Sequence, residues 1–314
     1  MPYSTTVQNC LSARRLGPTY APPEPLEDLH ILDLLELTGS QPKAGQALAM
    51  HQSTVCRSVQ KLTEQFRLQP RPGARVCRYG TNESLLLLRQ SYRAHRLMDG
   101  LLRIATDGFH QPLLAGMVSV QTVPPRCRLS HNWAQLLEQA LIDGAIVSSW
   151  CHPRLLPPQQ PPCWPGVTTV PLGELPMQLV TTAPETGDEL PPRKVLLPRK
   201  SITPLLHQTV GWHGFQVEQQ PVAYQEVSAW IKRLRDRDLV MPICEGLLEQ
   251  GWIEANGLMP HPQQPDLREQ LWLLLPAGPL PKSREARHLI RTLRQRLVKA
   301  GEELLGAGEL PEEE

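Results

Sequence analysis

Between residues 26 and 66, apolar side chains recur every three or four positions, which is the spacing of an α-helix with one buried face. The pattern forms three successive segments, LEDLHILDLLELTGS, SQPKAGQALAM and HQSTVCRSVQKLTEQF, with short breaks between them. Gly39 is a typical helix stop, and Ser53 is predicted to cap the third helix. Ala44 and Gly45 are small where the second and third helices must approach closely. Three helices joined by tight turns predict a helix-turn-helix unit.

The third segment has two contrasting faces. Its apolar residues lie at i, i+4, i+7 and i+11 and form one stripe, made of Val55, Val59, Leu62 and Phe66. Small polar and basic side chains occupy the rest, which is the kind of surface that the DNA major groove accepts. Many solvated surface helices share this composition, so the segment alone does not decide between the two interpretations.

Charge is distributed unevenly around this segment. From His51 to Gly80 there are six Lys and Arg residues against a single acid, Glu64, although the whole chain has a formal net charge of only +1. A nucleic-acid surface must therefore be local. The alternating, arginine-containing stretch ARVCRYGT predicts a short wing hairpin beside the helices.

The next segment, NESLLLLRQSYRAHRLMDGLL, predicts a long helix with Leu85, Leu88, Tyr92 and Leu101 near one face. A helix of this length must bury its apolar stripe against another surface. A second copy of the chain is the simplest partner, so we expect this helix to mediate dimerisation.

Beyond residue 101 the pattern changes to short apolar strands that alternate with helices, which is typical of parallel β/α units. The proline-dense stretch PRLLPPQQPPCWPG cannot lie inside a sheet. Strands are predicted at LLRIATD, RCRLS, AIVSSW, MQLVTTA, KVLLPR and LWLLLPA. Helices are predicted at QPLLAGM, HNWAQLLEQALIDG, SAWIKRLRDRD, ICEGLLEQG and SREARHLIRTLRQRLVKAGEELL.

These residues together resemble the LysR-type transcriptional regulators. The resemblance is clearest in the first three segments, where Gly39, the Ala44 and Gly45 pair, Arg57 and Val59 stand at the family spacing. It continues through TNESLLLL, LLRIATD, ALIDGAIV with Asp143, PLGELPMQLV and LVMPI. The departures are Cys56 in place of the usual Ser, Thr63 in place of Glu, the stretch RLQPRPG, and charged residues at 235–238 where the family tends to have glycines. The chain therefore looks like a diverged member.

The resemblance implies an N-terminal all-α winged helix-turn-helix and an α/β effector domain of the periplasmic-binding-protein type with two subdomains. The expected boundaries are a flexible tail at 1–25, the DNA-binding domain at 26–82, a linker and dimerisation helix at 83–101, the effector-binding-like domain at 102–300 and an acidic tail at 301–314. It also implies a sequence-specific regulator that binds double-stranded DNA as a homodimer or homotetramer.

Candidate site residues follow from chemistry and from position in this fold. Base edges need donors and acceptors, and phosphates need cations. The base-reading candidates are Gln52, Ser53, Thr54, Arg57 and Ser58, and the phosphate-binding candidates are Lys61, Arg75 and Arg78. Hydroxyls at strand ends and helix starts suit a small anionic effector, or simply cap helices. These effector candidates are Thr106, Ser130, Ser201 and Thr203. A degenerate C-terminal domain that serves only protein–protein contacts is the alternative.

The cysteine spacing and the hydropathy of the chain limit which classes of protein it can belong to. The seven cysteines are irregularly spaced and include no CxxC, so neither a disulfide framework nor a zinc site is predicted. The pairs Cys151 with His152 and Cys127 with His131 lack the glycine-rich turn or orienting carboxylate of a nucleophilic enzyme. We therefore expect no enzyme activity, no cofactor and no metal. Reduced thiols and the lack of a long apolar run or signal core predict a cytoplasmic protein outside the membrane.

Overall fold

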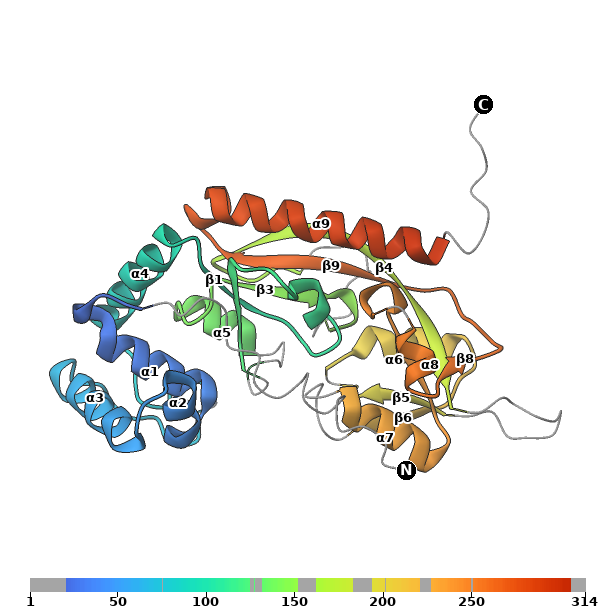
Figure 1. Ribbon diagram of the computed structural model, residues 1–314, viewed down its shortest axis with the longest axis horizontal. Coiled ribbons are helices and arrows are strands. Elements are labelled where there is room, and N and C mark those ends of the chain that lie inside the picture. The colour runs from blue at the N-terminus through green and yellow to red at the C-terminus, as the bar shows by residue number, and fades with distance from the viewer. Residues whose placement is uncertain are drawn as a thin grey trace, which may run out of the picture.

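The computed structural model describes residues 21–74, 76–124, 127, 132–151, 162–182, 194–200, 202–220, 227–249 and 251–305. Its N-terminal part is helical, and its C-terminal part is built on a nine-stranded mixed sheet flanked by helices (Figure 1). None of the described helices combines the length and the apolar character that a membrane crossing requires.

The three helices predicted at the N-terminus are present as α1 (Glu27–Thr38), α2 (Gln41–Leu48) and α3 (Gln52–Gln65), after a short 3-10 turn, η1 (Glu24–Leu26). Gly39 ends α1 in the left-handed conformation, with φ of 80°. A Cβ added to Gly45 would stand 2.7 Å from the backbone oxygen of Met50, so the turn into α3 requires a glycine there. One detail of the prediction is wrong. The cap of α3 is His51, whose side chain accepts a hydrogen bond from the backbone N–H of Ser53, because the helix begins two residues earlier than a cap at Ser53 implies.

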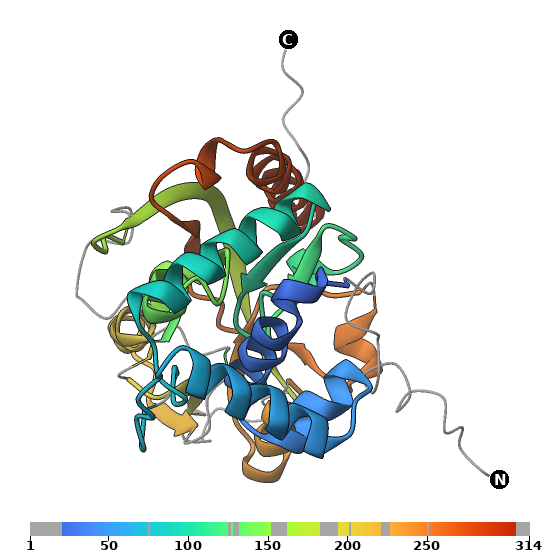
Figure 2. The ribbon, with the colours of Figure 1, turned by 90° about the vertical axis from the view of Figure 1, so that its left-hand side faces the viewer.

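Helix α1 is buried along nearly its whole length. Its buried residues, from Leu29 to Thr38, lie on all sides of the helix, so it is covered on more than one face. Leu29, Leu32 and Leu35 pack with α3, while Leu34 and Leu37 belong to a second core that includes residues of the α/β domain. The helical domain therefore lies directly against the α/β domain (Figure 2).

The predicted long helix is α4 (Glu83–Met98), but its apolar stripe does not need a second copy of the chain. Leu85 and Tyr92 are fully buried in the core that α1 and α3 share. Arg89 donates to Asp33 of α1 at 2.7 Å, and both side chains are fully buried. Within the chain, α1 offers the complementary face that we expected from a second copy, and dimerisation through this helix stays a prediction.

The wing hairpin is also not observed. Ala74 and residues 76–81 form turns rather than strands, and residue 75 lies outside the described residues. Val76 and Cys77 are buried against the same core as Leu34 of α1, and Cys77 has φ of 55°, which no extended strand allows. The apolar residues Val76 and Cys77 are thus buried side by side in the sequence and do not alternate in and out as in a hairpin strand.

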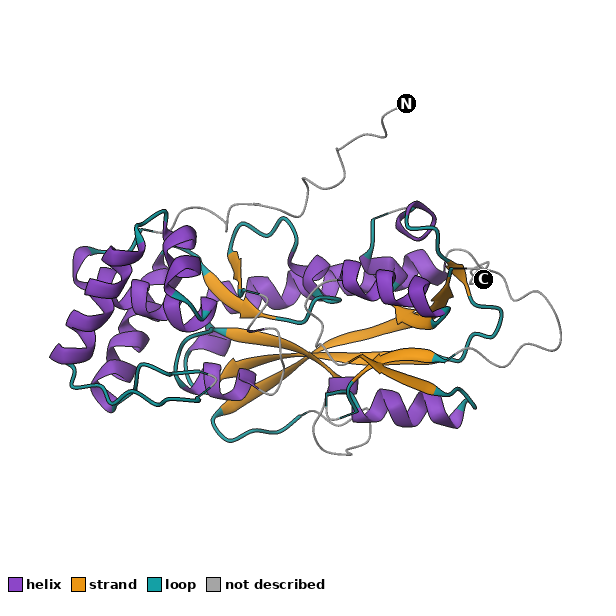
Figure 3. Cartoon of the chain, turned by 90° about the horizontal axis from the view of Figure 1, so that it is seen from below, coloured by secondary structure: helices purple, strands orange, loops and turns teal. Residues whose placement is uncertain are grey.

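The sheet has two halves joined by long strands, in the order β2-β1-β3-β9-β4-β7-β5-β6, with β8 paired to β4 (Figure 3). Parallel pairs occur at both ends, whereas the long strands β4 and β9 are antiparallel to each other. We call the half with β1 to β3 the first subdomain and the half with β5 to β7 the second subdomain. The strands are β1 (Leu102–Ala105), β2 (Val120–Thr122), β3 (Gly144–Ser148), β4 (Val167–Thr181), β5 (Val195–Pro198), β6 (Val217–Gln220), β7 (Val240–Ile243), β8 (Met259–Pro260) and β9 (Leu267–Pro276).

Helices cover both halves. Leu289, Leu293 and Leu297 of the last helix are buried with residues of β4 and β9, and the helix continues past the expected boundary at residue 300. The helices of the α/β domain are α5 (Trp133–Glu138), α6 (Pro204–Trp212), α7 (Val227–Arg237), α8 (Trp252–Ala255) and α9 (Arg284–Leu305). The 3-10 turns are η2 (Gln111–Leu114), η5 (Ser149–Cys151), η6 (Glu245–Leu247) and η7 (Leu280–Lys282).

Most of the predicted strands of this domain are confirmed, namely β1, β3, β5 and β9, with MQLVTTA forming the end of β4. The stretch RCRLS lies outside the described residues except for Cys127, which is in a 3-10 turn. QPLLAGM and ICEGLLEQG form the turns η2 and η6 instead of helices. The strands β2, β6, β7 and β8 and the helices α6 and α8 were not predicted.

Candidate nucleic-acid interface and interdomain cleft

The outer face of α3 is accessible. Val55, Val59 and Leu62 are buried against α1, as the apolar stripe predicts. The predicted base-reading residues all lie on the first two turns of the opposite side. Gln52, Ser53 and Arg57 are exposed and Thr54 and Ser58 are half-buried. We call the exposed and half-buried side chains of these five residues the α3 face.

The three predicted phosphate-binding residues are in different situations. Lys61 is exposed and forms a 2.7 Å ion pair with Asp28 of α1. Arg78 donates to the backbone oxygen of Gly39 at 2.6 Å and so binds the C-terminal end of α1. Arg75 lies outside the described residues. Arg78 thus already has a structural contact, which sequence reasoning did not anticipate.

A second candidate site lies in the cleft between the two subdomains. The cleft is almost closed, with a cavity of about 20 Å³, which is room for about one water molecule. Its walls come from the first subdomain, from the second subdomain and from the shared strands. They include the aromatic residues Phe109, Trp150 and Trp230 and the polar residues Asp107, His110, Ser148 and Glu269.

His110 is the centre of this polar group. It follows β1, and both of its ring nitrogens are engaged by carboxylates. Nδ1 is 2.6 Å from Asp107 Oδ2, and Nε2 is 2.6 Å from Glu269 Oε1. Two backbone N–H groups, those of Phe109 and His110, also donate to Asp107. The local turn after β1 therefore fixes both the ring and its first carboxylate.

The charges of this group depend on one another. Burial lowers the pKa of His110, but the negative charges of Asp107 and Glu269 outweigh burial and hold the pKa well above its usual value. Burial raises the pKa of Asp107, but the charge and the hydrogen bonds of His110 bring it below its usual value. An imidazolium ion between two carboxylates is therefore the stable form of this buried group.

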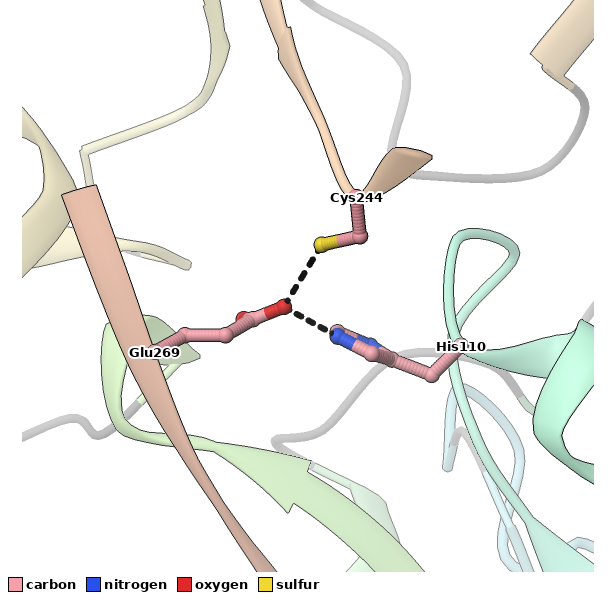
Figure 4. Close-up of side chains that lie close together, drawn as sticks. All are labelled: His110, Cys244 and Glu269. Carbon is pink, nitrogen blue, oxygen red and sulfur yellow. Dashed lines mark hydrogen bonds and ion pairs between the residues drawn. The ribbon is translucent and has the colours of Figure 1, made fainter. Parts of the chain in front are cut away.

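Glu269 receives further donors from both subdomains. The hydroxyl of Ser148, at the end of β3, donates to Oε2 at 2.5 Å, and the thiol of Cys244, directly after β7, donates to Oε1 at 3.2 Å. Burial and the charge of Glu269 raise the pKa of the Cys244 thiol, so the sulfur carries its proton. Figure 4 shows the three side chains of His110, Cys244 and Glu269 converging from three separate elements.

Sequence reasoning missed this group, although one signal was present. In β9, Leu267, Glu269 and Leu271 alternate with more exposed residues and are all buried. A carboxylate at an inward position of an alternating strand must have a partner, because an unpaired buried charge is costly. The identity of the partners could not be predicted, since they come from positions 25 and 159 residues away in the chain.

Of the four predicted effector residues, the structure describes two, Thr106 and Thr203. Thr106 and Thr203 are buried, and their hydroxyl groups have no hydrogen-bond partner among the described residues. Neither residue lines the 20 Å³ cavity. Ser130 and Ser201 lie outside the described residues.

No protein-family model and no curated protein sequence matches the chain. Solved structures do match. ArgP from Mycobacterium tuberculosis is similar with a TM-score of 0.50, 16% identity and coverage of 86% of this chain and 96% of that chain. A full-length OxyR variant from Pseudomonas aeruginosa has a TM-score of 0.49 at 12% identity, with 86% and 97% coverage. CbnR, a LysR family transcriptional regulator, has a TM-score of 0.46 at 10% identity, with 87% and 99% coverage. The chain thus resembles ArgP in its fold. At these identities the likeness concerns the fold.

Proposed function

We propose that this chain is a sequence-specific DNA-binding transcriptional regulator of the LysR type. The observation that carries the proposal is the exposed α3 face on a chain with this fold. Gln52 offers a donor and an acceptor, and Arg57 offers paired donors, for reading base edges. Both stand on the first two turns of the helix, where a recognition helix meets the major groove.

Phosphate contacts then fall to cations around α3. The Lys61 side chain of the pair with Asp28 is exposed, and ion pairs at the surface contribute little to stability, so a phosphate can replace the carboxylate. Arg78 would contact a phosphate only with N–H groups that it does not use on Gly39. Arg75 is the third proposed phosphate contact.

We also propose that the protein binds DNA as a homodimer or homotetramer. The copies of the chain would contact each other through the outer side of α4. Leu87, Ala94 and Met98 follow each other at helical spacing and are exposed, Leu87 by 58% and Met98 by 82%. The inner stripe is used within the chain, so this outer stripe is the apolar surface of α4 that a partner copy can cover.

We further propose that a small effector binds in the cleft between the two subdomains. In the closed state the cavity of about 20 Å³ is too small for a metabolite, so binding would require the two subdomains to separate. The buried hydroxyls of Thr106 and Thr203 are the groups that such an opening would offer. The cleft keeps its polar groups, which does not favour a domain reduced to protein–protein contacts.

Selection of genomic DNA fragments by the purified full-length protein tests the proposal. We expect a shared motif with two half-sites among the captured fragments, because a dimer presents two α3 faces. Capture without any common motif, at a salt concentration that suppresses non-specific binding, would contradict sequence-specific recognition.

A further inference from the structure

The cleft brings together three different kinds of metal ligand. Nε2 of His110, Sγ of Cys244 and a carboxylate oxygen of Glu269 all lie within 4.8 Å of one another, and all three residues are buried (Figure 4). A nitrogen, a sulfur and an oxygen donor at one point is the ligand set that Zn²⁺ and chemically similar cations prefer. Within the chain's described ranges, no other such group of three is found.

We propose that His110, Cys244 and Glu269 form a binding site for one divalent d-block cation, with Zn²⁺ as the best fit. Ligand bonds of about 2.0–2.3 Å in a tetrahedral arrangement separate the ligand atoms by roughly 3.3–3.7 Å. Sγ is now 3.2 Å and Nε2 2.6 Å from Glu269 Oε1, so a small outward movement of the imidazole makes room for the cation.

Asp107 completes the site from the far side of the ring. It accepts from Nδ1 of His110 at 2.6 Å, which leaves Nε2 to face Cys244 and Glu269. A carboxylate behind a ligating histidine fixes the ring and strengthens it as a ligand. Asp107 is itself held by two backbone N–H groups, so the arrangement is preformed.

Loading the site leaves its charge balanced. The cation replaces the Nε2 proton of His110 and the thiol proton of Cys244, both of which leave to solvent. One divalent charge thus takes the place of two protons, and the buried group keeps its net charge. The adjoining cavity of about 20 Å³ has room for a water molecule as the fourth ligand.

The ligands also have a mechanical consequence. His110 belongs to the first subdomain, Cys244 follows β7 of the second subdomain, and Glu269 lies on the shared strand β9. A cation bound to all three holds the cleft closed. This inference goes beyond the proposed DNA binding and does not depend on it.

Titration of chelator-treated, full-length protein with Co²⁺ tests the site, because a thiolate bound to Co²⁺ gives a near-ultraviolet charge-transfer band and tetrahedral Co²⁺ absorbs strongly in the visible. We expect one Co²⁺ per chain and its displacement by Zn²⁺. Cys244→Ser should abolish the charge-transfer band while keeping the size of the side chain. Asp107→Asn should weaken Co²⁺ binding by about 10–100-fold, the usual effect of removing a partner of a ligating histidine.

Two control variants separate this site from other thiols. Cys56→Ser removes an exposed thiol of α3. The double variant Cys151→Ser with Cys163→Ser removes the two cysteines that are closest to His152 in the sequence. Both should keep the band and the one-to-one stoichiometry. A band that survives in Cys244→Ser, a band lost in either control, or no stoichiometric binding by wild type would overturn the proposal. Thermal unfolding gives a second readout, since Zn²⁺ should raise the melting temperature of wild type and not of Cys244→Ser.

Discussion

The α3 face and the cleft use polar side chains in opposite ways. On α3, Gln52, Ser53 and Arg57 are exposed and keep much of their hydrogen-bonding capacity for a partner. In the cleft, Asp107, His110 and Glu269 are buried and bind one another. A large charged molecule can reach the first group without any rearrangement. The second group is closed to anything larger than an ion or a water molecule unless the subdomains separate.

The same contrast appears between ion pairs of the helical domain. Asp33 and Arg89 are both fully buried, whereas Lys61 of the pair with Asp28 is 61% exposed in its side chain. Breaking a buried pair leaves a charge without solvent or partner, while breaking an exposed pair leaves a charge in water. Both ion pairs are 2.7 Å long, so burial rather than distance decides how much each pair contributes to stability.

The largest effect is expected for Asp33→Ala, which leaves the buried Arg89 guanidinium without its carboxylate. We expect a loss of about 3–5 kcal/mol in the free energy of unfolding, measured by urea denaturation. Asp28→Ala is the matched control and should cost no more than about 1 kcal/mol. Equal losses in the two variants would show that burial does not separate these pairs. The double variant Asp33→Leu with Arg89→Met should recover much of the stability, because no buried charge remains.

An intermediate effect is expected from acidification, through His30 of α1. Burial lowers the pKa of His30 to about 3, and the nearby positive charges of Arg103 and Arg96 add to this shift. Its hydrogen bond with the Tyr92 hydroxyl lies in the same interface. The folded state thus keeps His30 neutral while the unfolded state takes up a proton below about pH 6.5. Stability should therefore fall by on the order of 2 kcal/mol between pH 6.5 and pH 5.

The difference between wild type and His30→Gln isolates this contribution in urea denaturation at the two pH values. The comparison is needed because His110 acts in the opposite sense. Its pKa is raised in the folded state, so its contribution is complete at low pH and is lost as the pH rises through the folded pKa. A wild-type protein that loses no more stability than His30→Gln on acidification would argue against a neutral His30.

The smallest effect on stability is expected on the outer side of α4. Leu87→Glu and Met98→Glu should change the free energy of unfolding of the monomer by no more than about 0.5 kcal/mol, because both side chains are exposed. They should nevertheless shift the protein towards monomers in sedimentation velocity. A dimer that persists in both variants at micromolar concentration would place the interface elsewhere. Leu88→Glu is a less clear test, because Leu88 packs against the core of its own chain.

The helices and strands that could be predicted are those with a strong local pattern. The stripe of α3, the stop at Gly39 and the apolar run of β9 each fix an element within a few residues of chain. The buried partners of α4 could not be predicted, because the same stripe of Leu85 and Tyr92 fits a second copy of the chain as well as α1. The periodicity of apolar residues indicates which face of a helix is buried, but it does not indicate which surface covers that face.

The two candidate sites differ in the same respect. The α3 face could be predicted because its residues lie within two turns of one helix. The cleft group could not, because His110, Cys244 and Glu269 are brought together only by the sheet topology. Arg96 illustrates the limit further, since its buried bonds to Asp143 join α4 to the α/β domain across 47 residues of chain.

Arg57 provides the most direct measurement of the central claim, that the α3 face reads DNA sequence. Its side chain is exposed on this face, and among the described residues its guanidinium makes one long hydrogen bond, 3.4 Å, to the backbone oxygen of Ser53. The measurement is the affinity of wild type and Arg57→Ala for a selected fragment and for a scrambled duplex of equal length, in the same salt. We predict that the variant loses about 1–3 kcal/mol of discrimination between the two duplexes while its affinity for the scrambled duplex changes little. Equal losses on both duplexes, or no loss on either, would contradict base recognition by this face.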